Sequence, residues 1–383
     1  MFRIMEGLLL CFIFSNAGSF FIKHYGLVQN WMLLLLLLIS LVPLALRSRK
    51  KIKVNGILST LFICGLMYLV GFTREPASVV GLAPYLMPLI SFFYLFLLGL
   101  QSDHKLMGYG PYLKISLAIL CFSIILEPVF TFSDLIVLER HPGVRASGFG
   151  LNPNGAAFMI LTLMVAIHII DGRISNRIFC LAALCILLTL SRSGLLCLLI
   201  VFILLNFRNI ALKKVGQGFV GLLIIYISVI MLLATTTLES SFLSKLAWQR
   251  INPLEQTVEI ERDSSRLDVL QRYVEGIAEN PIFGHGPRTG MKGLRVEKVS
   301  RDFRAHNTIL NIWLEVGILG ALSFIGFLLF AMVAGLKRTS ALLVAVVCLF
   351  YTFFINNLLQ MPHFWLMVGL LLAFNMEEKE KSI

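Results

Sequence analysis

The sequence predicts an all-α polytopic membrane protein with about twelve transmembrane helices. Hydrophobic residues make up 58% of its 383 residues and charged residues only 14%. A soluble domain of this length would need more polar surface. The mean hydropathy is +0.86. Runs such as 31–46 and 220–234 carry no charge, and they lack the apolar–polar alternation of membrane barrel strands. Membrane-spanning helices are therefore the expected elements.

The spans follow from the apolar runs in order along the chain, because a helix needs roughly 20 apolar residues to cross the hydrocarbon core. The first is expected to be retained rather than cleaved as a secretory signal, since a second span follows at once. A very tight polar turn at Ser191-Arg192-Ser193 separates the seventh span from the eighth. The predicted spans are residues 4–22, 29–46, 54–72, 83–100, 114–131, 153–170, 177–191, 193–207, 216–236, 306–335, 339–358 and 363–376.

These spans divide the chain into three parts. Residues 1–236 hold transmembrane helices 1–9, residues 237–305 form one large outer loop, and residues 306–383 hold helices 10–12 and a tail. With the N-terminus in the cytoplasm, the inner loops and termini contain 17 of the 33 Lys and Arg residues, the short outer loops 5 and the long loop 11. The positive-inside rule applies to short loops and largely exempts long ones. Both termini are therefore predicted to be cytoplasmic, and the charge of +12 reflects topology rather than a nucleic-acid partner.

The cysteines behave as small apolar residues. All of them fall inside predicted spans and none lies in the long loop, so we expect neither a disulfide framework nor a zinc site. They are Cys11, Cys64, Cys121, Cys180, Cys185, Cys197 and Cys348.

The long outer loop contains a predicted amphipathic helix over 265–279. Ser265 and Asp268 are spaced as a capping box, Asn280-Pro281 ends the helix, and Gly284-His285-Gly286-Pro287 follows as a turn. This helix must pack its apolar stripe on the membrane surface or on the ends of other helices, which predicts a folded lid over the outer mouth of the bundle. The stripe consists of Leu267, Leu270, Val274 and Ile277.

The re-entry of the chain into the membrane, at 306–320, carries the most informative polar residues. Asn307, Asn311 and Glu315 are spaced i, i+4, i+8 and share one helical face. Polar groups in a membrane are costly and are functional candidates by default. The alternative is that this face bonds neighbouring helices and that His306 only caps the span.

Basic residues beside the same outer mouth form a second set of candidates. The guanidinium of Arg192 has N–H donors whose geometry matches the oxygens of a phosphate. Its side chain could instead extend to the lipid headgroups. The tract from 284 to 305 would attract a pyrophosphate or an anionic sugar, with headgroup binding as the alternative. Its basic members are Arg288, Lys292, Arg295, Lys298, Arg301 and Arg304.

Three further features lie at the same outer level. Arg145 precedes Asn152-Pro153-Asn154, and Asn356-Asn357 lie near the outer end of the eleventh span. An Asn-Pro-Asn sequence is also a good helix start on local grounds alone.

Together these motifs resemble the O-antigen ligase and Wzy polymerase superfamily. The resemblance covers roughly residues 140–320. It rests on the His-Asn, nine-residue, Gly-x-x-Gly pattern that begins at His306, the Ser-Arg-Ser-Gly turn, the Asn-Pro-Asn start and the amphipathic loop helix. It implies a GT-C-like membrane fold in the bacterial inner membrane, with the large loop and the active site facing the periplasm.

The resemblance also implies the substrates and the residue roles. The donor would be an undecaprenyl-pyrophosphate-linked glycan, transferred either to lipid A–core (ligase) or to another lipid-linked repeat unit (polymerase, with a chain-length regulator as a further partner). Arg192 and Arg266, the latter in preference to Arg262, would hold the pyrophosphate. His306 would act on the acceptor hydroxyl, because imidazole titrates near neutral pH. The expected substrate-binding residues are Arg145, Asn154, Arg288, Arg304, Asn307, Asn311 and Glu315.

Two rival functions differ in where they need polar residues. A transporter or flippase needs ionisable residues at midplane depth or broken helices in symmetric halves, whereas these candidates gather at the outer ends. A scaffold needs no arginine and histidine beside one cavity. The chain has no Asp-x-Asp, which argues against a metal-held diphosphate, so we predict no metal and no cofactor. Ligase is preferred to polymerase by a small margin.

Overall fold

The computed structural model describes residues 10–11, 13–17, 63–67, 110–132, 146–150, 152–206, 266–286, 306–337, 339–355 and 358–370. Within these ranges every regular element is helical. The predicted spans 29–46, 83–100 and 216–236 lie outside the described residues, as does most of 4–22 and 54–72. The number of spans therefore stays a prediction.

Three described helices are long and apolar enough to cross a membrane: Gly110–Glu127, Pro153–Asp171 and Thr308–Gly335. They lie within α6 (Gly110–Phe132), α7 (Pro153–Asp171) and α15 (Thr308–Lys337), close to the predicted spans 114–131, 153–170 and 306–335. Shorter helices are α8 (Asn176–Leu188), α9 (Arg192–Asn206), α13 (Arg266–Glu279) and α16 (Thr339–Thr352), with short 3-10 turns η3 (Gly148–Gly150) and η4 (Leu358–Gln360).

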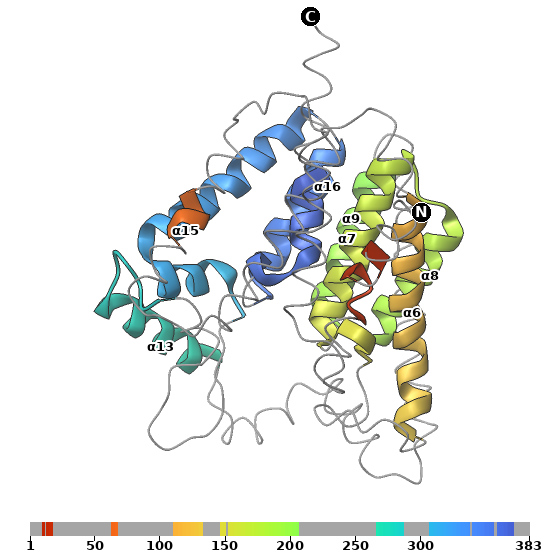
Figure 1. The fold of residues 1–383 in the computed structure, drawn as a ribbon, viewed down its shortest axis with the longest axis horizontal. Helices are drawn as coiled ribbons and strands as arrows, with labels where there is room; N and C mark the ends of the chain where they lie inside the picture. The colour runs from red at the N-terminus through yellow and green to blue at the C-terminus, as the bar shows by residue number, and fades with distance from the viewer. Residues whose placement is uncertain are drawn as a thin grey trace, which may run out of the picture.

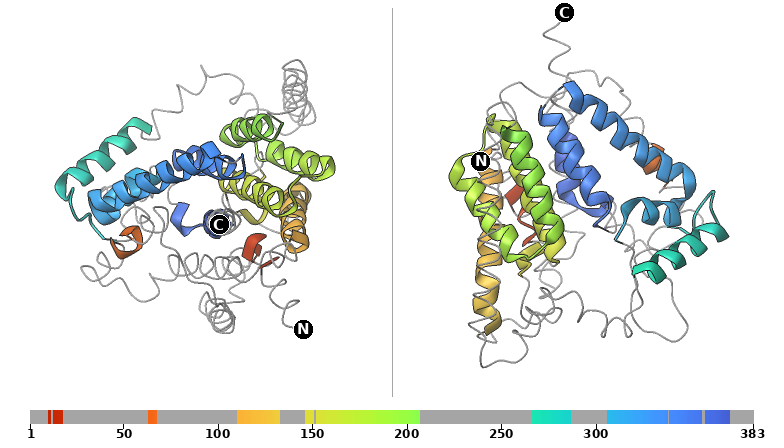
Figure 2. Two further views of the ribbon diagram at one scale, coloured as in Figure 1. Left: turned by 90° about the horizontal axis from the view of Figure 1, so that it is seen from above. Right: turned by 180° about the vertical axis from the view of Figure 1, so that it is seen from behind.

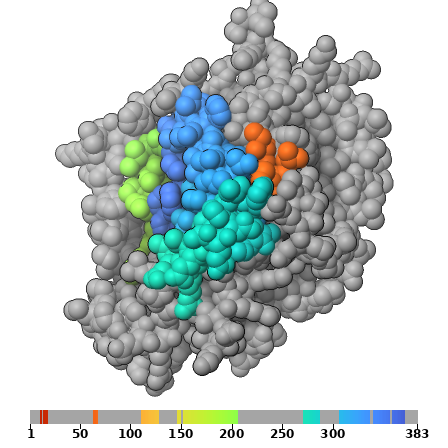
Figure 3. Space-filling model, turned by 90° about the vertical axis from the view of Figure 1, so that its left-hand side faces the viewer, coloured from red at the N-terminus to blue at the C-terminus, as the bar shows by residue number. Residues whose placement is uncertain are grey.

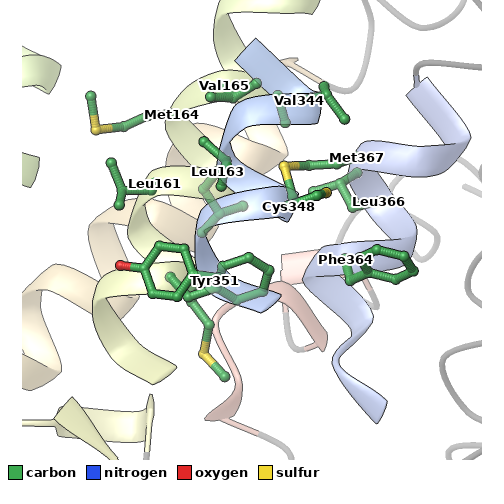
Figure 4. Close-up of a cluster of buried hydrophobic side chains, with 14 of the residues drawn as sticks. Leu161, Leu163, Met164, Val165, Val344, Cys348, Tyr351, Phe364, Leu366 and Met367 are labelled. Atoms are coloured by element: carbon green, nitrogen blue, oxygen red, sulfur yellow. The ribbon is translucent and has the colours of Figure 1, made fainter. Parts of the chain in front are cut away.

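The helices α6 to α9 form one group, and α16 lies between this group and α15 (Figure 1), as the reverse view in Figure 2 also shows. Nearly all of α7 is buried, so α7 is the centre of its group. Its side chains meet those of α16 and of a helical stretch at 362–370 in one apolar core (Figure 4). The labelled members are Leu161, Leu163, Met164, Val165, Val344, Cys348, Tyr351, Phe364, Leu366 and Met367.

A salt bridge joins α6 and α7 at one end of the pair. Lys114 Nζ lies 2.6 Å from Asp171 Oδ2, joining the start of α6 to the end of α7. Gly172 then ends α7 in a left-handed conformation, with φ +72°, which glycine adopts without steric cost. The predicted topology puts this end on the cytoplasmic side.

Two predicted spans prove to be interrupted. In the first span, Asn16 has φ +58°, a conformation that Asn tolerates better than most residues, and its amide donates to Phe149 O at 2.5 Å. In the span 306–335, Gly317 has φ +80° and ψ −175° inside α15. The predicted span is therefore helical, but Gly317 divides it into two segments, a break that the sequence did not predict.

Two predicted spans also end earlier in the structure than expected. The span predicted over 339–358 is helical only as far as Thr352 in α16, and turns follow at 353–355. The span predicted over 177–191 ends at Leu188. All seven cysteines are free thiols and only Cys180 is exposed, in agreement with their predicted apolar role.

Candidate functional site

The turn between α8 and α9 is built by Ser191. Its hydroxyl accepts from Gly194 N at 3.1 Å, which caps the first turn of α9. Gly194 allows α9 to approach α7, since a Cβ there would lie 2.6 Å from Ala157 Cβ. Arg192 is therefore fixed at the first position of α9, where its side chain is exposed.

The start of α7 is tied directly to this turn. Asn152 Oδ1 accepts from Asn154 N at 2.9 Å and Pro153 occupies the first helical position, as expected from local sequence. Asn154 Oδ1 then accepts from Ser191 Oγ at 2.8 Å. The Asn-Pro-Asn and Ser-Arg-Ser-Gly motifs, predicted separately, are thus one hydrogen-bonded unit.

The start of α15 is tied to the end of α16. Thr308 Oγ1 donates to Ile355 O at 2.8 Å and accepts from Leu358 N at 3.3 Å. Asn307 Oδ1 accepts from Leu310 N at 3.1 Å and so caps α15. His306 lies just outside the helix with an exposed side chain.

These two units lie at the same end of the bundle. The rings of Phe158, one turn into α7, and Tyr351, near the end of α16, are 4.9 Å apart. The end of α16 is bonded in turn to Thr308. The structure therefore places Asn154, Ser191, Arg192, His306 and Asn307 at one end, which we call the polar end.

Two of the predicted polar residues are buried just beyond the polar end. Asn311 is 1% exposed and Glu315 is fully buried. Within the described part of the chain, both polar atoms of the Asn311 amide are buried without a hydrogen-bond partner. Such an amide is destabilising unless something binds it, which marks Asn311 as a binding candidate.

The turn that follows α13 forms hydrogen bonds with the backbone groups that the break in α15 leaves without helical partners. His285 N donates to Leu314 O at 2.8 Å and Gly286 N donates to Glu315 O at 2.9 Å. In an unbroken helix these two carbonyls would accept from residues four positions later. Ile318 N donates instead to Pro281 O at 2.9 Å. We call this contact, between 281–286 and 314–318, the α13–α15 joint.

Close backbone contact makes glycine necessary on both sides of the joint. A Cβ on Gly284 would lie 2.6 Å from Glu315 O, and a Cβ on Gly317 would lie 2.0 Å from Ile282 O. Both glycines also have positive φ. The Gly-His-Gly turn and the first glycine of Gly-x-x-Gly are therefore two halves of one structural element.

The predicted apolar stripe of the loop helix is split between two environments. Ile277 is buried with Tyr273 against Leu314 of α15, whereas Leu270 and Val274 are 41% and 53% exposed. Tyr273, one turn before Ile277 and outside the predicted stripe, also contributes to the contact with α15. The side chain of Leu267 lies outside the described residues.

An acidic residue that the sequence analysis did not select holds the segment before α7. Glu127 Oε2 accepts from Ser147 N and from Gly148 N, both at 2.5 Å. Ser123 Oγ accepts from Phe149 N at 3.0 Å. A carboxylate in an apolar helix is a signal that could have been noticed, but its backbone partners leave no mark in the sequence.

Replacing Glu127 by leucine should lower the thermal stability of the protein, because it removes the acceptor of two backbone N–H groups. The expected loss is about 1–3 kcal/mol. Thermal unfolding of purified protein in detergent measures it. Phe122→Ala on the same helix, at a side chain that is 62% exposed, is the matched control. Equal losses in both variants would contradict this role.

The remaining predicted site residues are only partly described. Arg266 is the first residue of α13, and its side chain lies outside the description. Arg145, Arg288 and Arg304 lie outside the described residues altogether, as do Asn356 and Asn357. Their part in the site stays a prediction.

Comparison with known families supports the motif-based expectation. The family model described as O-antigen ligase (Wzy_C) matches residues 178–325, which is less than half of the chain. The match includes Arg192, Arg266, His306 and the joint, while Arg145 and Asn154 precede it. A search of curated proteins finds no match. Residues 178–325 are therefore similar in sequence to the O-antigen ligase family.

Proposed function

We propose that this protein transfers an undecaprenyl-pyrophosphate-linked glycan to lipid A–core on the periplasmic face of the bacterial inner membrane. The family domain implies O-antigen ligase or polymerase activity in general. The observation that supports the proposal is the polar end, where Arg192 begins α9 and His306 precedes α15. Hydrogen bonds and ring packing link these two helix starts through α7 and α16. An unsatisfied amide, Asn311, lies next to it.

The chemistry needs few protein groups because the donor is already activated. The acceptor oxygen forms a bond to the anomeric carbon of the donor sugar, and the bond from that carbon to the pyrophosphate oxygen breaks. Undecaprenyl pyrophosphate leaves with the electron pair. Arg192 and Arg266 stabilise this developing charge, and His306 takes the proton of the acceptor hydroxyl.

Polymerisation of lipid-linked repeat units is the second candidate. The same family match supports it, and the same groups would serve an acceptor hydroxyl on a second lipid-linked glycan.

Glycan profiling of a strain that lacks the gene tests the proposal. Loss of long glycan from lipid A–core, with lipid-linked polymer accumulating in the periplasmic leaflet, supports the ligase. Single repeat units attached to core would indicate a polymerase instead. Donor trapped in the cytoplasmic leaflet would indicate a flippase and contradict the proposal. Complementation with Arg192→Ala tests the site, since full restoration would remove Arg192 from it.

Replacing Asn311 by leucine should separate binding from folding. The substitution removes an unsatisfied buried amide, so the protein should be at least as stable as the wild type. Transfer should fall by about tenfold, because one hydrogen bond to the substrate is lost. Thermal unfolding and a transfer assay on the same preparation measure the two effects. Wild-type transfer by the stable variant would show that Asn311 binds no substrate.

Transfer should proceed unchanged in excess EDTA, because the arginines are expected to neutralise the pyrophosphate without a metal. Among the described residues, no three His, Cys, Asp or Glu side chains lie together as a metal site. A transfer reaction with purified protein, measured with and without EDTA, decides it. Activity that is lost in EDTA and restored by Mg²⁺ would contradict the prediction.

A further inference from the structure

The loop helix α13 has three distinct faces. Tyr273, Gly276 and Ile277 are buried on the side toward α15. Gln271, Glu275 and Glu279 form an exposed polar row. Between these two rows, at i, i+4, i+8, lie Leu270, Val274 and Ala278, which are apolar and exposed. A helix in uniform water would not need this third, apolar row.

The exposed apolar row continues into the joint and onto α15. The turn after α13 exposes Ile282 (55%) and Phe283 (43%). This turn is bonded to Ile318, and the next residue, Leu319, is 51% exposed, followed by Leu322 at 54%. Figure 3 shows α13 lying across one face of the molecule in contact with α15, with residues 63–67 beside α15 on the same face.

The level of the joint along α15 matches the edge of a bilayer. From Ile318 to Lys337 the second segment of α15 has about 20 residues, or about 30 Å, which equals the thickness of the hydrocarbon core. The outer end of this segment is the joint, which therefore lies at the outer edge of the hydrocarbon core. Trp313 lies just beyond it and donates Nε1–H to Pro281 O at 3.0 Å. Tryptophan with a bonded N–H is typical of membrane–water interfaces.

From these faces and this level we infer that α13 and its turn insert Leu270, Val274, Ile282 and Phe283 into the outer leaflet of the bilayer. The occupant of the apolar row is the acyl-chain region of phospholipids just beneath the headgroups. The row Gln271, Glu275, Glu279 faces water, and the row Tyr273, Gly276, Ile277 faces α15. This arrangement is that of an interfacial amphipathic helix. It holds the joint, and with it the start of α15, at the depth where a lipid-linked pyrophosphate would lie.

Spin-label accessibility in lipid nanodiscs tests this inference. Single cysteines replace Leu270, Val274, Ile282 or Phe283, with Gln271→Cys and Glu275→Cys as matched controls on the same helix. The background carries Cys180→Ser, because the other six cysteines are buried. The nanodiscs contain phosphatidylethanolamine and phosphatidylglycerol. Collisions with oxygen, which concentrates in the bilayer, are compared with collisions with a water-soluble nickel chelate.

We expect labels at 270, 274, 282 and 283 to collide preferentially with oxygen and labels at 271 and 275 to collide preferentially with nickel. Equal nickel access at all six positions would overturn the inference by placing the row in water. Low access to both reagents at 270 and 274 would overturn it as well, since protein would then cover them. The readout does not use transfer activity, so it succeeds or fails independently of the proposed function.

Discussion

His306→Ala should lower glycan transfer by at least about a hundredfold while leaving the protein folded, because loss of a general base costs roughly 10² to 10⁴ in rate. The side chain of His306 is exposed and lies before the first turn of α15. Its removal therefore takes nothing from the buried core. A transfer assay with purified protein, lipid-linked donor and lipid A–core acceptor measures the loss.

His168→Ala is the matched control for this prediction. His168 lies near the opposite end of α7, in its last turn, away from the polar end. We expect His168→Ala to keep wild-type transfer within a few fold. Transfer by His306→Ala at the wild-type rate would contradict the proposed role of His306. Equal losses in the two variants would show a general effect on the bundle instead.

Gly317→Ala should destabilise the protein strongly and abolish transfer, because no L side chain fits the joint. Its φ of +80° with ψ of −175° belongs to a region that only glycine readily occupies. An added Cβ would also lie 2.0 Å from Ile282 O and 2.4 Å from Ile282 C. The backbone strain alone costs about 1–3 kcal/mol, and separation of the joint would expose the carbonyls of Leu314 and Glu315.

Thermal unfolding and amide hydrogen exchange measure the effect of Gly317→Ala. Faster exchange should appear first at His285 N, Gly286 N and Ile318 N, the three donors of the joint. Gly65→Ala is the control, because a Cβ at Gly65 would meet nothing within 4 Å. A Gly317→Ala protein with wild-type stability and unchanged exchange would show that the joint is not rigid.

The helices that local sequence could specify were predicted closely. Asn152-Pro153 starts α7 and Ser191 caps α9 through side-chain bonds within three residues, so no distant contact is needed to locate them. The break in α15 could not be predicted in this way. Gly317 lies in an apolar run that favours helix, and its conformation depends on Pro281–Gly286, about thirty residues earlier in the chain.

The site shows the same division between local and distant information. Residue type and spacing selected Arg192, His306 and Asn311 as candidates, because such groups are costly near a membrane. They did not show that Asn307 caps α15 or that Asn154 is bonded to Ser191. Glu127 and Tyr273 were missed because their partners are a distant backbone segment and another helix.

The most direct test of whether the polar end binds a polyprenyl diphosphate is to measure that binding with purified protein in nanodiscs. Affinity for undecaprenyl pyrophosphate is measured for the wild type, Arg192→Ala and His306→Ala. Arg192→Ala should weaken binding by roughly tenfold or more, since hydrogen bonds to charged groups contribute about 1.5–3 kcal/mol. His306→Ala should bind within a few fold of the wild type. Unchanged affinity in Arg192→Ala would contradict the account.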